Sequence, residues 1–327
     1  MAELISNFAG IRIRNPLIVS SSSLTGTLSG LRKAADNGAG AVVLKSLFEE
    51  QIAHGVDQQL GQLDSNAHTE ALDYLEQMGM HVGGKQYLDL LTEAKKVLGI
   101  PIFASINCIG LNWWSEFSAQ LESAGADGLE LNIGLLPRNP TETAANIEER
   151  MYAIVDLVRS HTKLPLVVKL GSAFTNIAAV CAGLANRGVK AIVLFNRFYQ
   201  LDINLDSLQL QPGVVFSNPQ DYYQSLRWIS LLHCDFDLDF AAATGIHDAQ
   251  AALRCILAGA GAIQICSTIY KNGYGVIRRM LDEMEAWMKT KNFSSIADFR
   301  GLLCQKESDQ PAAYERLQYI KALTGIN

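Results

Sequence analysis

The sequence has no apolar run long enough to span a membrane and no cluster of basic residues. Over 327 residues, 27 lysines and arginines stand against 33 aspartates and glutamates, for a formal net charge of −6. The first absence argues against a transmembrane protein, and the acidic balance argues against nucleic acid as the main partner. The first ten residues, MAELISNFAG, also lack the charged n-region and the long apolar h-region of a secretory signal peptide. We therefore expect a cytoplasmic protein that binds neither membrane nor nucleic acid.

Motifs for metals and dinucleotides are also missing. No C-x-x-C pair is present, so a zinc ribbon or iron–sulfur cluster has little support and we expect no metal site. No G-x-G-x-x-G follows the first apolar run, which disfavours a dinucleotide-binding open sheet. Most of the cysteines are expected to be free, buried thiols. The six are scattered: Cys108, Cys181, Cys234, Cys255, Cys266 and Cys304.

The stretch 238–267 predicts a βαβ unit. Apolar runs at 238–243 and 262–266 have the length of strands, and a helix at 247–258 lies between them. Such short connections imply parallel strands. Small residues follow both strand ends, so backbone N–H groups there are open to a phosphate. In a (β/α)8 barrel the phosphate commonly sits after strands 7 and 8.

Eight apolar runs alternate with helical segments along the chain. Continuous apolar runs are typical of strands buried on both faces. We predict a single (β/α)8 barrel over residues 1–327, with an N-terminal hairpin at 7–14, insertions after strands two and six, and a short helix at 293–301. A doubly wound open sheet is the alternative. The strands are expected at 17–20, 41–45, 101–106, 128–133, 166–170, 191–195, 238–243 and 262–266, and the helices at 28–37, 85–98, 112–124, 141–162, 177–187, 219–232, 247–258 and 275–289.

Polar side chains gather at the C-terminal ends of these strands, where the active sites of barrels lie. Lys45 and Lys169 are costly to bury without an anion. Their partner could be Glu130, but we favour a bound anionic cofactor or substrate. Asn132 and Asn196 lie at matching strand ends. The other polar residues there are Ser20 to Ser23, Ser46, Ser105, Asn107, Arg197, Thr244 and Ser267.

Six stretches together resemble the dihydroorotate dehydrogenase family, in particular its soluble class 1 and the dihydroorotate dehydrogenase-like proteins. They are GIRIRNPLIVSSSS, AVVLKS, GADGLELN, LPLVVKL, LFNRFYQLDINLD and ATGIHDAQAALRCILAGAGAIQICS. The resemblance covers nearly the whole chain. It implies a (β/α)8 fold with FMN at the C-terminal mouth, a homodimer, and oxidation of a CH–CH group in a small planar anion. Dihydroorotate, oxidised to orotate in pyrimidine biosynthesis, is the family's substrate.

Carried over residue by residue, the resemblance implies a set of flavin and substrate contacts. Lys169 matches a lysine near the flavin N1–C2=O edge, where positive charge stabilises the reduced ring. Lys45 and Asn132 would be catalytic. The implied substrate contacts are Lys45, Met78, Gly79, Asn132 and Asn196. The implied cofactor contacts are Ser20, Ser21, Ser22, Lys45, Ser46, Asn107, Asn132, Lys169, Thr244, Gly245, Cys266 and Ser267.

Leu135 stands where the family has its catalytic base. The family's strand-four motif continues Asn-Leu-Ser-Cys-Pro-Asn, and its cysteine takes a proton from the substrate. Here residues 132–137 read Asn-Ile-Gly-Leu-Leu-Pro, and leucine cannot accept a proton. The substrate loop also departs from the family, reading Gln-Met-Gly-Met-His over 77–81. By position His81, Cys108 or Ser23 could replace the base, although such residues are more often ordinary loop or core residues.

Three hypotheses follow. The first is an FMN-dependent oxidoreductase whose planar anionic substrate is held by Lys45 and Asn196. The second is a dihydroorotate dehydrogenase with its base elsewhere. The third is a flavin-binding or flavin-free barrel without dehydrogenase activity. Because losing a general base typically costs about 10²–10⁴-fold in rate, we place the first above the second.

Overall fold

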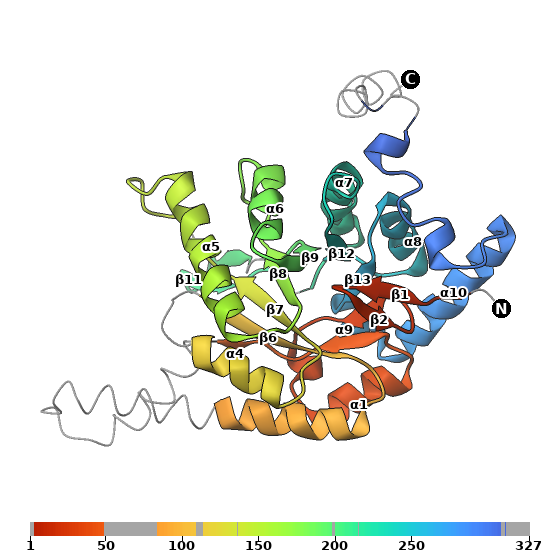
Figure 1. Ribbon diagram of the computed structural model, residues 1–327, viewed down its shortest axis with the longest axis horizontal. Coiled ribbons are helices and arrows are strands. Elements are labelled where there is room, and N and C mark those ends of the chain that lie inside the picture. The colour runs from red at the N-terminus through yellow and green to blue at the C-terminus, as the bar shows by residue number, and fades with distance from the viewer. Residues whose placement is uncertain are drawn as a thin grey trace, which may run out of the picture.

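Eight parallel strands close into a barrel in the computed structural model, which describes residues 3–48, 84–108, 114–135, 137–197, 200–214, 216–308 and 311 (Figure 1). Pairing of β13 with β3, and of β4 with β6, completes the ring. The predicted (β/α)8 fold is confirmed. In ring order the strands are β3 (Leu17–Val19), β4 (Ala41–Val43), β6 (Ile102–Cys108), β7 (Gly128–Ile133), β8 (Leu166–Leu170), β9 (Val189–Leu194), β12 (Asp239–Ala243) and β13 (Ala262–Ile265).

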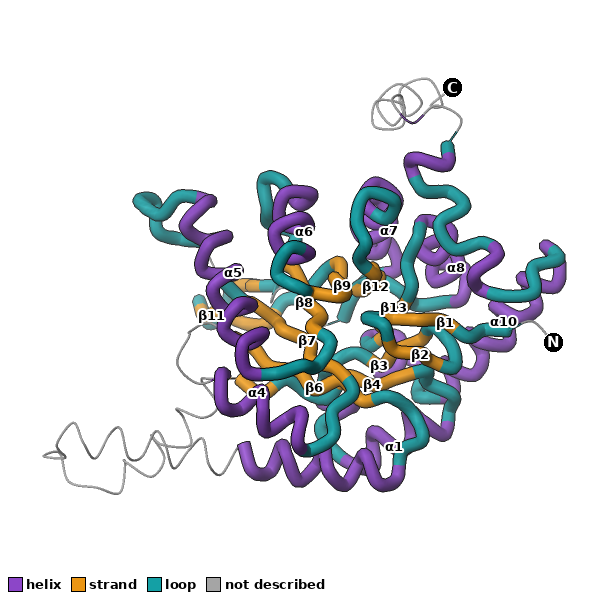
Figure 2. The backbone as a smooth tube through the Cα atoms, in the orientation of Figure 1, coloured by secondary structure: helices purple, strands orange, loops and turns teal. Residues whose placement is uncertain are grey.

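Helices surround the strands (Figure 2). Local capping fixes several of their starts: Thr27, Asn176 and Asp248 each accept a hydrogen bond from a backbone N–H three residues on. Within the described ranges no helix is long and apolar enough to cross a membrane. The helices are α1 (Leu28–Asp36), a helix at 84–97, α4 (Trp114–Ser123), α5 (Ala144–His161), α6 (Ile177–Ala185), α7 (Tyr222–Leu232), α8 (Ala249–Ala258) and α10 (Gly275–Lys291).

Several elements differ from the prediction. The insertion after strand six contains a hairpin, β10 (Leu201–Asn204) with β11 (Gln209–Pro212), and a short helix α9 (Ser267–Asn272) follows β13. A two-residue strand, β5 (Leu47–Phe48), begins the insertion after strand two. The predicted helix at 293–301 is wrong. That segment holds only one 3₁₀ turn, η3 (Ile296–Asp298), because Asp298 turns back to the N–H groups of Ser294 and Ser295.

The predicted N-terminal hairpin is present as β1 (Ser6–Phe8) with β2 (Ile11–Ile13), and it covers the N-terminal end of the barrel. Ser6 donates to Gly261 just before β13, and the Ala9 N–H donates to Asp239 at the start of β12. Phe8 packs against Phe103 with ring centroids 5.8 Å apart. Because many inward strand residues are alanines, these rings fill the space that small side chains leave.

Two of the six cysteines are exceptions to the expectation that most are free thiols. Cys234, just after α7, forms a disulfide with Cys304. Backbone hydrogen bonds from 301 and 303 to the end of α8 bring Cys304 to this place. Cys181 and Cys255 are free and buried, and burial raises the pKa of each thiol to about 12. Cys266 is free and half-buried.

Asn15 links the N-terminal hairpin to the barrel through two side-chain hydrogen bonds, and we expect these bonds to stabilise the fold. Its amide donates to the Gly38 carbonyl at 2.7 Å and accepts from the Leu17 N–H at 3.1 Å. Asn15→Leu would leave both buried backbone groups without partners, so we expect the free energy of unfolding to fall by about 2–5 kcal/mol in urea titrations. Asn37→Ala removes a comparable but exposed bond to Lys33 and should cost under about 1 kcal/mol. Equal losses would contradict the assignment.

Candidate functional site

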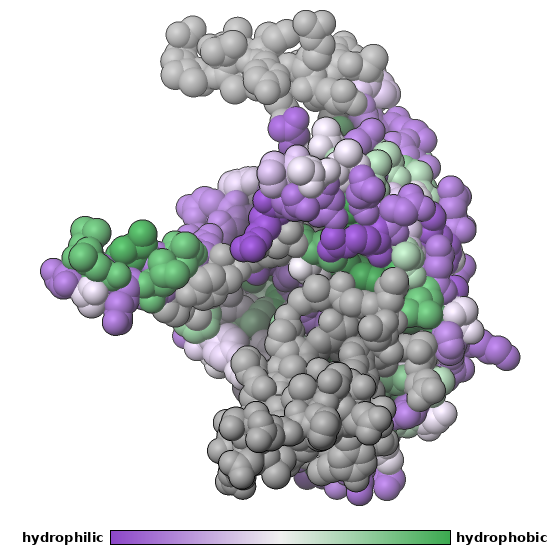
Figure 3. All heavy atoms as spheres, turned by 90° about the vertical axis from the view of Figure 1, so that its left-hand side faces the viewer, coloured by the Kyte–Doolittle hydropathy of each residue, from purple (hydrophilic) through white to green (hydrophobic). Residues whose placement is uncertain are grey.

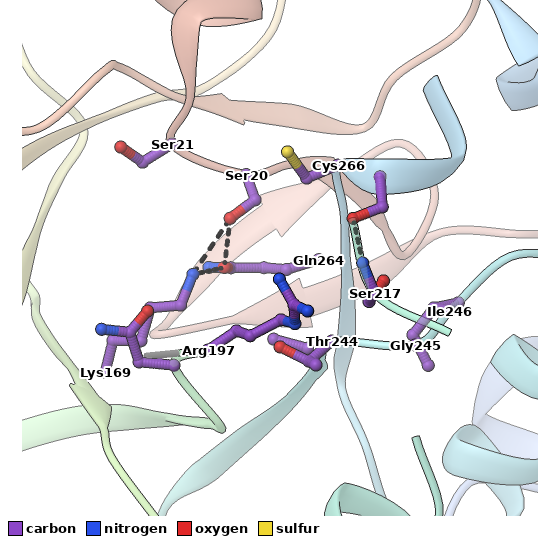
Figure 4. A pocket seen from close by; sticks show the side chains of 13 residues that line it. Ser20, Ser21, Lys169, Arg197, Ser217, Thr244, Gly245, Ile246, Gln264 and Cys266 are labelled. Carbon is purple, nitrogen blue, oxygen red and sulfur yellow. Dashed lines mark hydrogen bonds between the residues drawn. The ribbon is translucent and has the colours of Figure 1, made fainter. Parts of the chain in front are cut away.

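A cavity of about 220 Å³ lies at the C-terminal ends of the strands (Figure 4). It brings together eight residues expected to bind cofactor or substrate: Ser20, Ser21, Lys169, Asn196, Thr244, Gly245, Cys266 and Ser267. The other lining residues are Arg197, Ser217, Ala243, Ile246 and Gln264. Arg197 was noted from the sequence only as a polar strand-end residue. Ser217 and Gln264 were missed.

The remaining predicted residues do not line this cavity. Lys45 follows β4 and is exposed, with its stem over Gly26, so the premise that this lysine is buried is wrong. Asn132 reaches the cavity indirectly, since it accepts a 2.9 Å hydrogen bond from the Asn196 amide. Asn107 is its neighbour in the β6–β7 ladder. Ser22 and Ser46 lie beside the lining serines. Met78, Gly79 and His81 fall outside the described residues.

Strand alternation creates a polar layer at the mouth. Val167 on β8 and Ala262 on β13 belong to the apolar cluster inside the barrel. Two residues further along each strand, side chains point the same way, which places Lys169 and Gln264 one layer above that cluster. Glu130 on β7 joins them. Both the polar layer and the apolar layer beneath it are therefore formed by inward-facing residues of the same strands.

Lys169 is the centre of this layer and is 7% exposed. Its Nζ donates to Ser20 Oγ at 3.0 Å and to Gln264 Oε1 at 2.8 Å. The Glu130 carboxylate lies further away, with Oε1 4.0 Å from Nζ. The alternative partner considered for this lysine is thus present, but only as a long-range ion pair. Figure 4 shows Lys169, Ser20 and Gln264 converging on one wall of the cavity.

A chain of hydroxyls leads away from Ser21. Ser21 Oγ lies 2.9 Å from Ser46 Oγ, which lies 2.7 Å from Ser105 Oγ. The N–H of Ser105 donates to the Tyr87 hydroxyl at 2.8 Å. Burial, with a smaller contribution from the charge of Glu130, raises the pKa of Tyr87 far above its ordinary value. The chain of hydroxyls therefore ends at Ser105, and Tyr87, bonded to the Ser105 backbone, is a phenol that stays protonated and supplies no base.

The other end of the cavity is formed by backbone turns. Thr244 and Gly245 are both left-handed, with φ of 68° and 80°. A Cβ on Gly245 would lie 2.3 Å from the Tyr222 nitrogen, so only glycine fits. Within the described residues, no acceptor pairs with the N–H groups of Gly245, Ile246 or Ser267. Successive N–H groups in such turns form anion-binding concavities.

Ser217 lines this end of the cavity, and the Val214 carbonyl lies against Arg197. The Ser217 N–H donates to Ser267 Oγ at 3.0 Å, and its hydroxyl lies 3.1 Å from His247 Nε2. Lys271 Nζ donates to the Ser217 carbonyl at 2.9 Å, and Arg197 donates to the Val214 carbonyl at 2.6 Å. The insertion after strand six thus contributes to the site. The pattern of predicted strands could not locate this contribution.

Neither Leu135 nor the described candidates offer a clear base. Leu135 is half-buried against the apolar core. Ser23 is exposed and bonds to the Tyr270 hydroxyl at 2.5 Å. Cys266 lines the cavity, but burial raises the pKa of its thiol, against the smaller opposing effects of a Ser22 hydrogen bond and the charge of Lys169. The side chain of Cys108 lies outside the described part of the structure.

We expect His247 to make the free energy of unfolding depend on pH. Burial, followed by the charge of Lys271, lowers the pKa of His247 below its ordinary 6.5. The unfolded chain therefore binds the proton more readily, and the stability that the neutral ring contributes is lost as the pH falls below 6.5. We expect His247→Gln to flatten the decline in unfolding free energy between about pH 7 and pH 5, the range in which histidine titrates. Parallel curves for the wild-type and His247→Gln proteins would refute this.

Comparison with known proteins gives the family. The dihydroorotate dehydrogenase family profile matches residues 3–288. The catalytic subunit of dihydroorotate dehydrogenase B (NAD(+)) from Methanocaldococcus jannaschii is 24% identical, over 89% of this chain and 95% of its own length. The Thermoplasma volcanium subunit of the same name is 25% identical, over 94% and 100%. Chloroplastic dihydropyrimidine dehydrogenase (NADP(+)) from Arabidopsis thaliana is 22% identical, over 89% and 75%. The resemblance seen in the sequence is confirmed: the chain belongs to the dihydroorotate dehydrogenase family.

Proposed function

We propose that this protein is an FMN-dependent oxidoreductase acting on the CH–CH group of a small planar anion, with dihydroorotate as the first candidate substrate. The observation that carries the proposal is the pairing of two features in one cavity. A buried ammonium, Lys169, lies at one end, and at the other lie two turns whose N–H groups have no acceptor within the described residues. A ligand with one phosphate and one electron-rich ring edge would match both ends.

The residues present fit FMN. Its phosphate would be held at Thr244-Gly245 and Cys266-Ser267, where N–H groups can donate because no described residue accepts from them. Lys169 would face the ring edge that gains negative charge on reduction. When bound, FMN would supply the two-electron acceptor that a dehydrogenase needs. The other proposed contacts are Ser20, Ser21, Ser22, Lys45, Ser46, Asn107 and Asn132.

The paired asparagines support a substrate with an amide-like edge. Asn196 Nδ2 donates to Asn132 Oδ1, which leaves Asn196 Oδ1 as an acceptor and Asn132 Nδ2 as a donor for a ligand. Such a pair can read an N–H group beside a carbonyl, as in a pyrimidine ring. Lys45 is the cation that we propose meets the negative charge of the substrate, beside Asn196. We propose Lys45 and Asn132 as the catalytic residues. We propose Met78 and Gly79 as further substrate contacts.

One observation favours a second candidate function, a flavin-binding or flavin-free barrel without dehydrogenase activity. Leu135 occupies the base position, and neither Ser23 nor Cys266 compensates for it. Proton abstraction from carbon would then lack an acceptor among the candidates that the structure describes.

An absorption spectrum followed by anaerobic addition of dihydroorotate tests the proposal. We expect flavin bands at roughly 370 and 450 nm. Bleaching would identify dihydroorotate as a substrate, and bands that persist would point to a different planar anion. Lack of any bands, even after FMN is added, would reject the oxidoreductase and leave the flavin-free barrel.

Leu135→Cys is the matching gain-of-function test. If the substrate is dihydroorotate and only the base is missing, the thiol should raise the rate of flavin bleaching by about 10²–10⁴-fold. Leu135→Ala makes the same space without a proton acceptor and should give no gain. Stopped-flow absorbance under anaerobic conditions measures both. Equal rates for the two variants would show that the base position is not what limits this chain.

We further propose a homodimer and a cytoplasmic location, as the family resemblance and the sequence suggest. The β10–β11 hairpin supports the dimer because its large apolar side chains are unusually exposed, with Leu205 at 82% and Leu208 at 81%. Figure 3 shows apolar residues gathered on a projection at the left of the view. Exposed patches of this kind commonly mark protein–protein contacts.

Light scattering during gel filtration tests the dimer. The wild-type protein should elute at twice the chain mass, and Leu205→Asp with Leu208→Asp should shift it to the monomer, since burying these charges would be costly. Leu302→Asp with Leu303→Asp, at exposed positions near the disulfide, is the control and should remain dimeric. A monomeric wild-type protein would reject the dimer.

A further inference from the structure

Gln264 lies between the two buried charges of the site. It is 2% exposed, against 1% for Glu130 and 7% for Lys169. Its Nε2 donates to Glu130 Oε2, and its Oε1 accepts from both Lys169 Nζ and Ser20 Oγ. Chemistry fixes this orientation, because a carboxylate only accepts hydrogen bonds and an ammonium only donates them. A flipped amide would face both charged neighbours with the wrong atom.

Not all N–H donors of the Lys169 ammonium have an acceptor. An ammonium has three N–H donors. Ser20 and Gln264 take two of them, and Glu130, with Oε1 at 4.0 Å from Nζ, is too distant to take the third. Glu130 Oε1 itself has no hydrogen-bond partner within the described residues. One donor on Lys169 and one acceptor on Glu130 therefore remain unused beside each other.

Two opposite buried charges this close attract strongly, because little water screens them. A direct hydrogen bond would form if Nζ moved by about the difference between 4.0 Å and the usual 2.8 Å or so. Such a bond would satisfy both unused groups and draw the positive charge away from the cavity. The Gln264 amide, bonded to both partners, holds them apart.

We propose that Gln264 is a positioning residue that keeps the Lys169 ammonium directed into the cavity, short of Glu130, where it can meet an anionic ligand. This inference rests on the proposed function only in naming that ligand as the ring edge of the flavin. The Glu130 carboxylate orients the amide, and the amide positions the lysine. Gln264 itself need not touch the cofactor's reacting atoms.

Crystal structures of two variants test the positioning step without any cofactor. In Gln264→Leu, Lys169 Nζ should lie within hydrogen-bond distance of Glu130 Oε1 and should have left Ser20. In Gln264→Glu, a carboxyl that donates its proton to Glu130 and accepts from Lys169 reproduces the wild-type pattern, so Nζ should stay in place. Lys169 unmoved in Gln264→Leu, or displaced equally in both variants, would overturn the proposal.

The midpoint potential of the bound flavin, measured by spectroelectrochemistry, gives a second readout. Gln264→Leu withdraws positive charge, so reduced flavin should be bound at least tenfold less favourably relative to oxidised flavin, a shift of about 30 mV to lower potential for a two-electron couple. Glu130→Gln keeps the acceptor for the amide but removes the negative charge, and should shift the potential upward. Loss of packing alone predicts no such opposite signs, and shifts of the same sign would contradict the assignment.

The two proposals fail in distinguishable ways. If neither wild type nor variants bind flavin, the proposed function fails, but the position of Lys169 in Gln264→Leu and Gln264→Glu still decides the role of Gln264. If flavin binds and Lys169 does not move, the function stands and the positioning role is rejected.

Discussion

A buried ammonium is the constraint on which the rest of this molecule depends. Removing an ion such as that of Lys169 from water costs several kcal/mol unless its neighbours replace the lost hydration. Those neighbours come from across the barrel: Glu130 from β7, Gln264 from β13, and Ser20 just after β3. Glu130 lies on the strand next to Lys169, but Ser20 and Gln264 come together because the last strand pairs with the first in the observed register. The two hydrogen-bond acceptors of the ammonium therefore depend on closure of the sheet.

At the opposite end of the barrel, apolar residues from distant parts of the chain also come together. Inward positions at the lower layer are mostly small, and Phe8 enters from the N-terminal hairpin to fill the space they leave. The barrel thus has a packed apolar layer at one end and a polar mouth at the other, both built from the same alternation of side chains. Firm packing beneath the site is what the positioning role proposed for Gln264 requires.

The sequence predicted what depends on local pattern. All eight strands, the strand-end position of Lys169 and the turn at Thr244-Gly245 could be read from apolar runs and small residues. What depends on closure could not be read. Gln264 is one polar residue inside the run AIQIC, and nothing local shows that it faces a lysine and a glutamate 95 and 134 positions away. The burial expected for Lys45 failed because β4 ends at Val43, two residues earlier.

Loss of the base and retention of the charged layer have different chemical consequences. A general base matters for substrates whose C–H bond must lose a proton as hydride leaves the neighbouring carbon, and its loss costs about 10²–10⁴-fold. An ammonium beside an electron acceptor matters for any substrate, because it stabilises the charge that every reduction creates. On the proposed function, Leu135 leaves unmet a requirement specific to one class of substrate, while Lys169, Gln264 and Glu130 would supply the part common to all. Such a site would favour substrates whose proton is already acidic or is accepted by another group of the substrate itself.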